Sequence, residues 1–309
     1  MNYGYFDEKN KEYVITRPDT PAPWANYLGS PEYGAIISNN AGGYSFVKSG
    51  ANGRISRYIF NQEDKPGRYV YLRDDDEKDY WSASWQPVGK PLEEYQNECH
   101  HGTAYTTIRA KYKEIESEVL YYVPLNKTHE IWRVTVKNTS DRPRNISTFG
   151  YIEFTNESNY ENDLVNLQYT LFITRTYFKE NKILQAINEN HYKNAEGTNF
   201  KERFFGLAGA KVASYNGDKS HFIGNYHSYG NPVALENGEC DNVLNYNSNG
   251  CGALHTKMTL APGESKEFVF ILGQKNDKES AEILNSYADL SVVDRELAEL
   301  KNYWHGKLN

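Results

Sequence analysis

Most of the chain alternates hydrophobic and polar residues with a period of two. In residues 130–140, Trp132, Val134 and Val136 fall on one face of an extended chain, and mainly polar residues alternate with them. This period is typical of half-buried strands. Similar patterns predict further strands at or within residues 13–17, 55–60, 68–73, 103–112, 117–125, 146–154, 167–178, 182–188, 204–215 and 255–273. Turns rich in glycine, asparagine and aspartate separate these segments, so we expect one large, mainly β, antiparallel sandwich rather than βαβ units.

The pattern changes to helical spacing after Gly273. Apolar residues recur every three or four positions at Ala281, Leu284, Ala288, Val293, Leu297, Leu300 and Trp304. This spacing predicts two helices, the second capped by Asp289 or Ser291. We therefore divide the chain into a β domain over residues 1–275 and a helical linker over residues 276–309. Little of the sandwich is left for the end of the second helix, so we expect its apolar stripe to be exposed and a further domain to follow.

Composition and charge narrow the possible partners. The 309 residues carry a formal net charge of −7 with acids and bases interspersed, which disfavours a nucleic-acid partner because such binding needs a basic face. No apolar run is long enough for a signal peptide or a membrane span, so we expect a cytoplasmic protein without a membrane partner. Three cysteines (Cys99, Cys240 and Cys251) form no disulfide framework and fit a reducing compartment.

The usual catalytic signatures are absent. Five acids in residues 72–81 include candidates for the paired carboxylates of a glycosidase, but a run of like charges between strands is more often a solvated hairpin. His100 and His101 follow Cys99, and neighbours on a strand point to opposite faces, so a metal site there would need a bulge. Cys240, Cys251 and His255 also lack a zinc spacing. We predict no metal site, cofactor or catalytic centre from these motifs.

Aromatic residues mixed with small polar residues provide the strongest functional signal. Such stretches occupy residues 21–29, 39–46, 53–58, 80–89 and 165–172. In residues 39–46, a glycine pair stands directly before Tyr44 and Phe46, and Lys48, Arg54 and Arg57 follow closely. Aromatic faces stack on sugar rings while amides and guanidinium groups bind hydroxyls. Each stretch alone is more often part of a sandwich core; together they suggest a sandwich associated with carbohydrate.

Several of these blocks resemble the N-terminus of the glycoside hydrolase family 94 disaccharide phosphorylases, such as the cellobiose, diacetylchitobiose, laminaribiose and cellobionic acid phosphorylases. The similarity lies in residues 3–46, 54–58, 66–88 and 101–108, and it continues in residues 261–273 and 297–304. It covers essentially the whole chain. The resemblance implies a β-supersandwich of the galactose-mutarotase type, followed by linker helices and then an (α/α)6 catalytic barrel. That barrel lies outside this sequence.

The resemblance also implies a reaction. The family performs inverting phosphorolysis, in which phosphate attacks the anomeric carbon of a β-linked disaccharide and an aspartic acid protonates the leaving oxygen. Inorganic phosphate is then a co-substrate and no cofactor is needed. The acid and the phosphate pocket belong to the barrel, so we expect this chain to hold no catalytic residue. The implied partners are the disaccharide or its acceptor sugar, together with a homodimer partner or a separately encoded barrel.

The resemblance implies acceptor-binding residues in two segments. Tyr44, Phe46 and Val47 match a loop of the family that lies on the acceptor side of the active site, and Gln168 and Tyr169 match a strand on the same rim. Val47 stands where an aromatic is common, and Tyr169 stands where cellobiose enzymes tend to have arginine. Both departures argue against a plain cellobiose specificity.

Two other functions remain open at this point. A free-standing carbohydrate-binding module would have no need of an exposed stripe at Leu300 and Trp304, so the second helix is the feature that separates it from a phosphorylase domain. An aldose mutarotase would need a histidine and a glutamate paired in the cleft of the sandwich, and no such pair is evident from the sequence.

Overall fold

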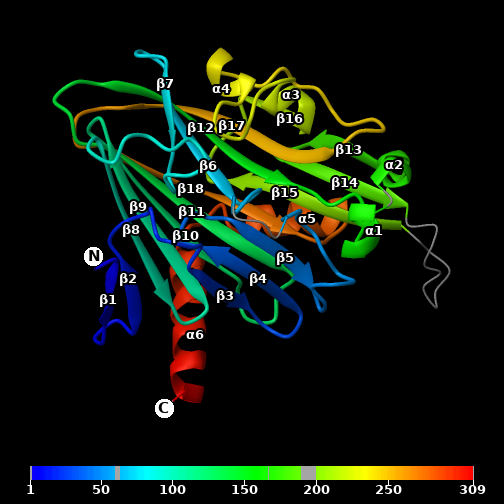
Figure 1. The fold of residues 1–309 in the computed structure, drawn as a ribbon, viewed down its shortest axis with the longest axis horizontal. Helices are drawn as coiled ribbons and strands as arrows, with labels where there is room; N and C mark the ends of the chain where they lie inside the picture. The colour runs from blue at the N-terminus through cyan, green and yellow to red at the C-terminus, as the bar shows by residue number, and fades with distance from the viewer. Residues whose placement is uncertain (1, 60–62, 166, 189–199, 309) are drawn as a thin grey trace.

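Three antiparallel sheets build the molecule in a computed structural model, which describes residues 2–59, 63–165, 167–188 and 200–308 (Figure 1). The ten-stranded sheet has the order β1 (Gly4–Asp7), β2 (Glu12–Ile15), β8 (Tyr95–Gly102), β9 (Tyr105–Tyr112), β10 (Ile115–Tyr122), β11 (His129–Asn138), β18 (Ser265–Gly273), β15 (Phe200–Ala208), β14 (Lys182–Asn188) and β13 (Thr174–Lys179). The five-stranded sheet has the order β16 (Ser214–Asp218), β17 (Gly250–Leu260), β12 (Arg144–Glu153), β6 (Tyr69–Asp74) and β7 (Asp79–Ser82). The small sheet consists of β3 (Ala25–Gly29), β4 (Tyr33–Ser38) and β5 (Gly43–Val47).

Helical segments follow strands β12, β16 and β18. They are α1 (Tyr160–Val165), α2 (Leu167–Thr170), the 3-10 helix η1 (Leu171–Ile173), α3 (Lys219–Ile223), α4 (Val233–Asn237), α5 (Asp277–Ser286) and α6 (Ser291–Leu308). The mainly β, antiparallel architecture predicted from the sequence is confirmed.

The main core lies between the ten-stranded sheet and the two smaller sheets. Trp132 and Val134 on β11 contribute to one buried cluster with Leu72 on β6 and Ile37 on β4, so all three sheets face the same interior. The layers approach closely at Gly150 on β12, because a Cβ there would lie 2.7 Å from the ring of Phe270. The apolar positions of the alternating pattern in the sequence therefore correspond to side chains that face this interior.

A second apolar cluster covers the opposite face of the ten-stranded sheet. The side chains of Leu120, Tyr122 and Ile131 point away from the main core and meet Val293 and Leu300 of α6. Leu300 is fully buried, and Leu297 and Trp304 are partly buried against the same cluster. The prediction of an apolar stripe without a surface to pack on is therefore wrong, because the outer face of the sheet supplies that surface. The stripe cannot separate a phosphorylase domain from a free-standing module.

The helix boundaries follow ordinary capping rules. The side chain of Asn276 accepts a hydrogen bond from the backbone N–H of Glu279, and the backbone N–H of Asn276 donates to the Glu279 carboxylate, a capping box that starts α5. Asp289 accepts from the backbone N–H of Ser291 and so caps α6, as one of the two predicted alternatives. The two predicted helices are confirmed. Their separation from the β domain as a linker stays a prediction.

Two strand predictions are wrong. The described part of residues 55–60 forms no strand, because its backbone groups are divided between two partners: Ile55 donates to Ser45, and Arg57 donates to Glu153. Residues 167–173 are helical, and a strand begins only at Thr174. Just before these residues, Asn159 accepts from the backbone N–H of Asn162 at 2.9 Å and caps α1.

Candidate functional site

The candidate site begins at the glycine pair before β5. Gly43 has φ of +115°, which favours glycine, and a Cβ on Gly42 would lie 2.2 Å from the carboxylate of Asp64. The pair thus lets the chain turn tightly against Asp64 and enter β5. Tyr44 and Phe46 follow on one face of β5, half-buried, with ring centroids 6.0 Å apart, and Val47 is half-buried at the end of the strand. The three predicted rim residues of this segment are therefore neighbours on one strand.

A buried ionic network holds β5 from beneath. Ser45 donates to Glu130 at 2.7 Å, and Arg68 donates to the other oxygen of Glu130 at 2.7 Å and to the Ser45 hydroxyl at 2.6 Å. Trp132 also donates to Glu130, at 2.8 Å. Arg68 and Glu130 are both fully buried. This network joins the back of β5 to β11 of the large sheet.

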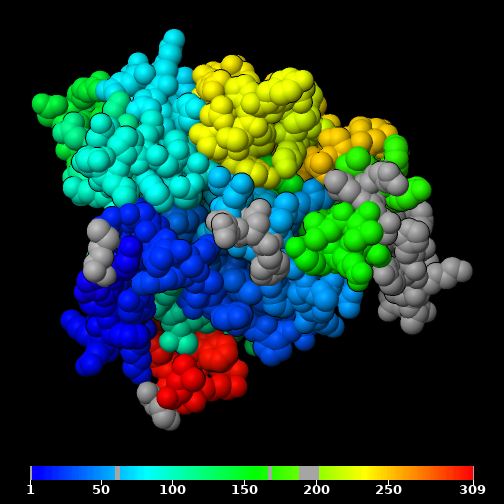
Figure 2. All heavy atoms as spheres, viewed as in Figure 1, coloured from blue at the N-terminus to red at the C-terminus, as the bar shows by residue number. Residues whose placement is uncertain are grey.

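The residues after β5 bind the segment that leads into α1. Arg54 lies between two rings, with its guanidinium carbon 3.6 Å from the centroid of Tyr44 and 4.1 Å from that of Tyr160. Arg57 pairs with Asp163 through two hydrogen bonds of 2.9 and 3.0 Å and with Glu153 at 3.0 Å. Figure 2 shows the green surface around α1 directly beside the blue atoms of the earlier segment. The two predicted rim segments thus share a common support.

Opposite charges keep Arg57 and Glu153 ionised in this buried place. Burial works against the charged form of each group, but the attraction between them outweighs it: Glu153 and Asp163 raise the pKa of Arg57, and Lys219 and Arg57 lower the pKa of Glu153. Glu153 also accepts a 2.5 Å hydrogen bond from Tyr229. With all its oxygens engaged, Glu153 serves as an anchor of the site rather than as a proton donor.

Tyr169 lies on α2, in a helix rather than on the predicted strand. Its side chain is 63% exposed and makes no ring contact or hydrogen bond with the residues that the structure describes. Val165 and Phe172 on either side are also exposed. Gln168 belongs to the same helix, and its side chain lies outside the described part of the chain. The end of α1, α2 and η1 therefore expose apolar and phenolic side chains to solvent, while Asp163 of α1 is buried.

Sequence reasoning missed the roles of Glu130, Arg68, Asp163 and Glu153. Arg54 and Arg57 stood out as cations near the aromatic pair, but their partners lie about a hundred residues away along the chain. Asn159, followed by acidic Glu161 in the first turn, is a helix-start signal that indicates α1. The partner carboxylates have no such local signal.

The other candidates from the sequence have structural partners. In the acidic run, Asp74 is buried against Arg144, and Asp79 accepts hydrogen bonds from Lys90, Lys113 and Tyr112. Burial raises the pKa of Asp79, but the hydrogen bonds outweigh burial and lower this pKa to about 2. The run is a β6–β7 hairpin, as expected, but its end residues are paired rather than solvated.

The adjacent histidines diverge, as predicted for neighbours on a strand. His100 contacts Glu12 and Glu98, whereas His101 contacts Thr106 and the carbonyl of Trp24. Among the described residues, no three histidine, cysteine or acidic side chains gather in a way that could hold a metal ion.

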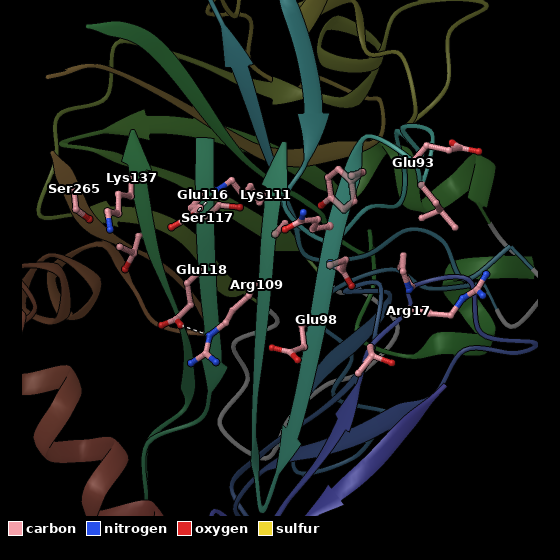
Figure 3. A pocket seen from close by; sticks show the side chains of 18 of the residues that line it. Arg17, Glu93, Glu98, Arg109, Lys111, Glu116, Ser117, Glu118, Lys137 and Ser265 are labelled. Atoms are coloured by element: carbon pink, nitrogen blue, oxygen red, sulfur yellow. Dashed lines mark hydrogen bonds and ion pairs between the residues drawn. The ribbon is translucent and has the colours of Figure 1, made fainter. Parts of the chain in front are cut away.

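A large hollow lies away from the candidate rim, on the outer face of the ten-stranded sheet. It measures about 1000 Å³, and Figure 3 shows charged side chains of β8, β9, β10 and β11 lining it. Arg109 pairs with Glu118 at 2.7 Å and Lys111 pairs with Glu116 at 3.0 Å. Tyr95 is its only aromatic lining residue and is buried. These charges satisfy one another across the strands, and no exposed ring offers a sugar platform.

None of the described helices combines the length and the apolar character that a membrane crossing needs.

Comparisons with known proteins agree with the resemblance seen in the sequence. The family model for the glycosyl hydrolase 94 supersandwich domain matches residues 11–290. The N,N'-diacetylchitobiose phosphorylase of Vibrio proteolyticus is 42% identical over 307 residues, which are 98% of this chain and 37% of that protein. The solabiose phosphorylase of Paenibacillus borealis is 29% identical over 90% of this chain and 35% of its own length. This chain thus spans little more than a third of the curated relatives it matches.

A solved structure of a bacterial glucoamylase in complex with acarbose shares the fold. Its TM-score is 0.52 at 8% identity, over 97% of this chain and 42% of that one. At this identity the likeness shows the fold alone.

Proposed function

Because this chain belongs to glycoside hydrolase family 94, whose supersandwich domain it matches over residues 11–290, we propose that it is the non-catalytic, acceptor-side domain of an inverting disaccharide phosphorylase. In the proposed reaction, a phosphate oxygen bonds to the anomeric carbon of a β-linked disaccharide as the glycosidic bond breaks. The leaving oxygen takes a proton from an acid in a catalytic barrel, and the products are a sugar 1-phosphate and a free acceptor sugar.

One observation carries the acceptor-side assignment: two segments with exposed or half-exposed aromatic rings are fixed to one another through buried ion pairs. Tyr44 and Phe46 lie on β5, and Tyr169 lies on α2 beyond the anchor at Asp163. A sugar-binding rim needs aromatic faces and polar groups held in a fixed relation. Gln168 would add an amide able to donate to and accept from two hydroxyls.

The relatives suggest where to look for the substrate. Two Vibrio proteins at 42% identity are N,N'-diacetylchitobiose phosphorylases, so that disaccharide is the first to test. Homodimer formation and a cytoplasmic location belong to the same proposal. The exposed Val165 of α1 and Phe172 of η1, on either side of Tyr169, support a partner surface at this place.

A chimaera tests the acceptor assignment. Residues 1–309 would replace the matching part of the Vibrio proteolyticus relative, and kinetics would be measured in the synthetic direction. We expect Gln168→Ala to weaken acceptor binding by roughly 1–3 kcal/mol, the cost of leaving a buried polar partner unpaired. Phosphate affinity should stay unchanged, because its ligands lie outside this chain.

Gln96→Ala is the matched control, since Gln96 is an exposed glutamine on β8 at the outer face of the large sheet. Gln96→Ala should change neither the affinity for the acceptor nor the affinity for phosphate. Loss of phosphate affinity in Gln168→Ala, with acceptor affinity kept, would show that the helix does not form the acceptor rim.

A further inference from the structure

Arg54 is a buried cation whose surroundings differ from those of the other buried arginines. Arg54 is 2% exposed, and its guanidinium carbon lies over the rings of both Tyr44 and Tyr160. The Nε atom donates to the carbonyl of Gly50 at 3.0 Å, whereas the buried Nη1 atom has no hydrogen-bond partner. Burial lowers the pKa of this guanidinium. The two ring faces are therefore its main favourable electrostatic contact.

The neighbouring Arg57 shows what a conventional buried arginine looks like here. Arg57 has two carboxylates, Glu153 and Asp163, within hydrogen-bond distance. Within the described ranges, no carboxylate forms an ion pair with Arg54. Arg57 thus neutralises buried acids, a role that Arg54 cannot have.

The position of Arg54 connects two segments that are far apart in sequence. Tyr44 stands on β5, and Tyr160 is the first residue of α1. The backbone N–H of Arg54 donates to the carbonyl of Ser158, and the N–H of Tyr160 donates to the carbonyl of Ala51. Backbone hydrogen bonds thus hold the two segments side by side, and the Arg54 side chain holds the two rings that project from them.

We propose that Arg54 is a positioning residue that clamps Tyr44 of β5 and Tyr160 of α1 in one stack, so that the two parts of the acceptor rim are held as one rigid unit. The consequence for acceptor binding rests on the proposed function; the clamp itself does not. A planar guanidinium stacks on two rings at once, which an ammonium group or an aliphatic side chain cannot do.

Hydrogen exchange tests the clamp on the chain itself. In Arg54→Met, which keeps a long unbranched side chain, amides of α1 over Tyr160–Val165 should exchange about tenfold faster, while those of β11 and β12 keep their protection. Tyr160→Leu should produce the same local change, and the double variant should be no worse than either alone. Tyr160→Phe keeps the ring and should retain the protection of α1. This difference between the two Tyr160 variants separates loss of the ring stack from a general packing defect. Lys48→Met, at an exposed cation of the same loop, is the control.

Unchanged exchange of α1 in both Arg54→Met and Tyr160→Leu would overturn the clamp, as would faster exchange spread evenly over the whole sandwich. Should Arg54→Met fail to fold, the comparison of Tyr160→Leu with Tyr160→Phe still decides the question.

Kinetics of the chimaera test the consequence for the rim. The acceptor KM should rise about tenfold in Arg54→Met and in Tyr160→Leu but not in Tyr160→Phe, with the phosphate KM unchanged in all three. The role of the clamp in binding would be overturned if the acceptor KM were equal in these variants and the parent while Gln168→Ala did weaken acceptor binding in the same chimaera. If Gln168→Ala itself has no effect, the proposed function fails, and the exchange experiment still decides the clamp.

Discussion

Replacing Glu130 with glutamine is expected to destabilise the folded chain by about 3–5 kcal/mol. Glu130 accepts hydrogen bonds from Ser45, Arg68 and Trp132, and neither it nor Arg68 has contact with solvent. Glutamine leaves the charge of Arg68 buried without a counter-charge and places an NH2 group where an acceptor is needed. Urea unfolding at pH 7, followed by circular dichroism, measures the change in free energy.

Glu118→Gln is the matched control for this prediction. Glu118 accepts from Nε of Arg109 at 2.7 Å, the same atom type and distance as in the Arg68–Glu130 pair, but Arg109 and Glu118 are partly exposed to water. Exposed pairs contribute about 0–1 kcal/mol. Combining Arg68→Met with Glu130→Gln should recover part of the loss, since no unpaired charge remains. Equal effects of Glu130→Gln and Glu118→Gln would contradict the account of the buried network.

Lowering the pH from 7 to 5 is expected to destabilise the protein by several kcal/mol. Burial lowers the pKa of His101 to about 4 and the pKa values of His129 and His255 to about 3. As the pH falls below 6.5, the unfolded chain binds protons that the folded chain cannot bind, so stability is lost from pH 6.5 down to about pH 4 for His101 and about pH 3 for His129 and His255. At pH 5 each histidine contributes a loss of about 2 kcal/mol, or roughly 6 kcal/mol for the three together.

His100 opposes this trend. Its hydrogen bond to Glu12 raises its pKa, so its contribution to stability is fully present below pH 6.5 and offsets part of the loss. The test compares urea unfolding at pH 7 and pH 5 for the parent, for His255→Gln and for His221→Gln. His255→Gln should reduce the pH dependence by about a third, and His221→Gln, at an exposed residue paired with Asp241, is the control. A parent protein equally stable at both pH values would contradict the buried, neutral histidines.

The hydrogen bonds of His255 explain why it stays neutral. Ser147 donates to Asp75, so its hydroxyl oxygen is left to accept from Nε2 of His255 at 2.9 Å. Ser214 then donates to Nδ1 at 2.8 Å. The ring also stacks on Phe149 at 4.1 Å. A second proton on Nδ1 would face the hydroxyl hydrogen of Ser214, so protonation requires this arrangement to break.

The strands were predictable because each of them buries alternate residues against one interior. In β11, Trp132, Val134 and Val136 point into the core, as the sequence indicated. The same strand carried a signal that was not used: Ile131 stands on its otherwise polar face, and it packs in the cluster under α6. An apolar residue on that face indicates a covering element, which here is the helix whose stripe was predicted to be exposed.

The two aromatic segments could be identified from the sequence, but their arrangement in space could not. The aromatic pair after the glycines and the aromatic stretch over residues 165–172 marked both segments. Their connection depends on Arg54 meeting Tyr160 and on Arg57 meeting Asp163, pairs separated by about a hundred residues. Hydrophobic periodicity reports burial within one segment, whereas such pairings depend on the tertiary arrangement.

The division of labour between this chain and a catalytic barrel is the central claim, and release of sugar 1-phosphate tests it most directly. Purified 1–309 would be incubated with N,N'-diacetylchitobiose and inorganic phosphate, in parallel with the chimaera that joins it to the remainder of the Vibrio proteolyticus relative. The account predicts no sugar 1-phosphate from 1–309 alone and release from the chimaera. Phosphorolysis by 1–309 alone would contradict it, because the acid and the phosphate site would then lie within the sandwich.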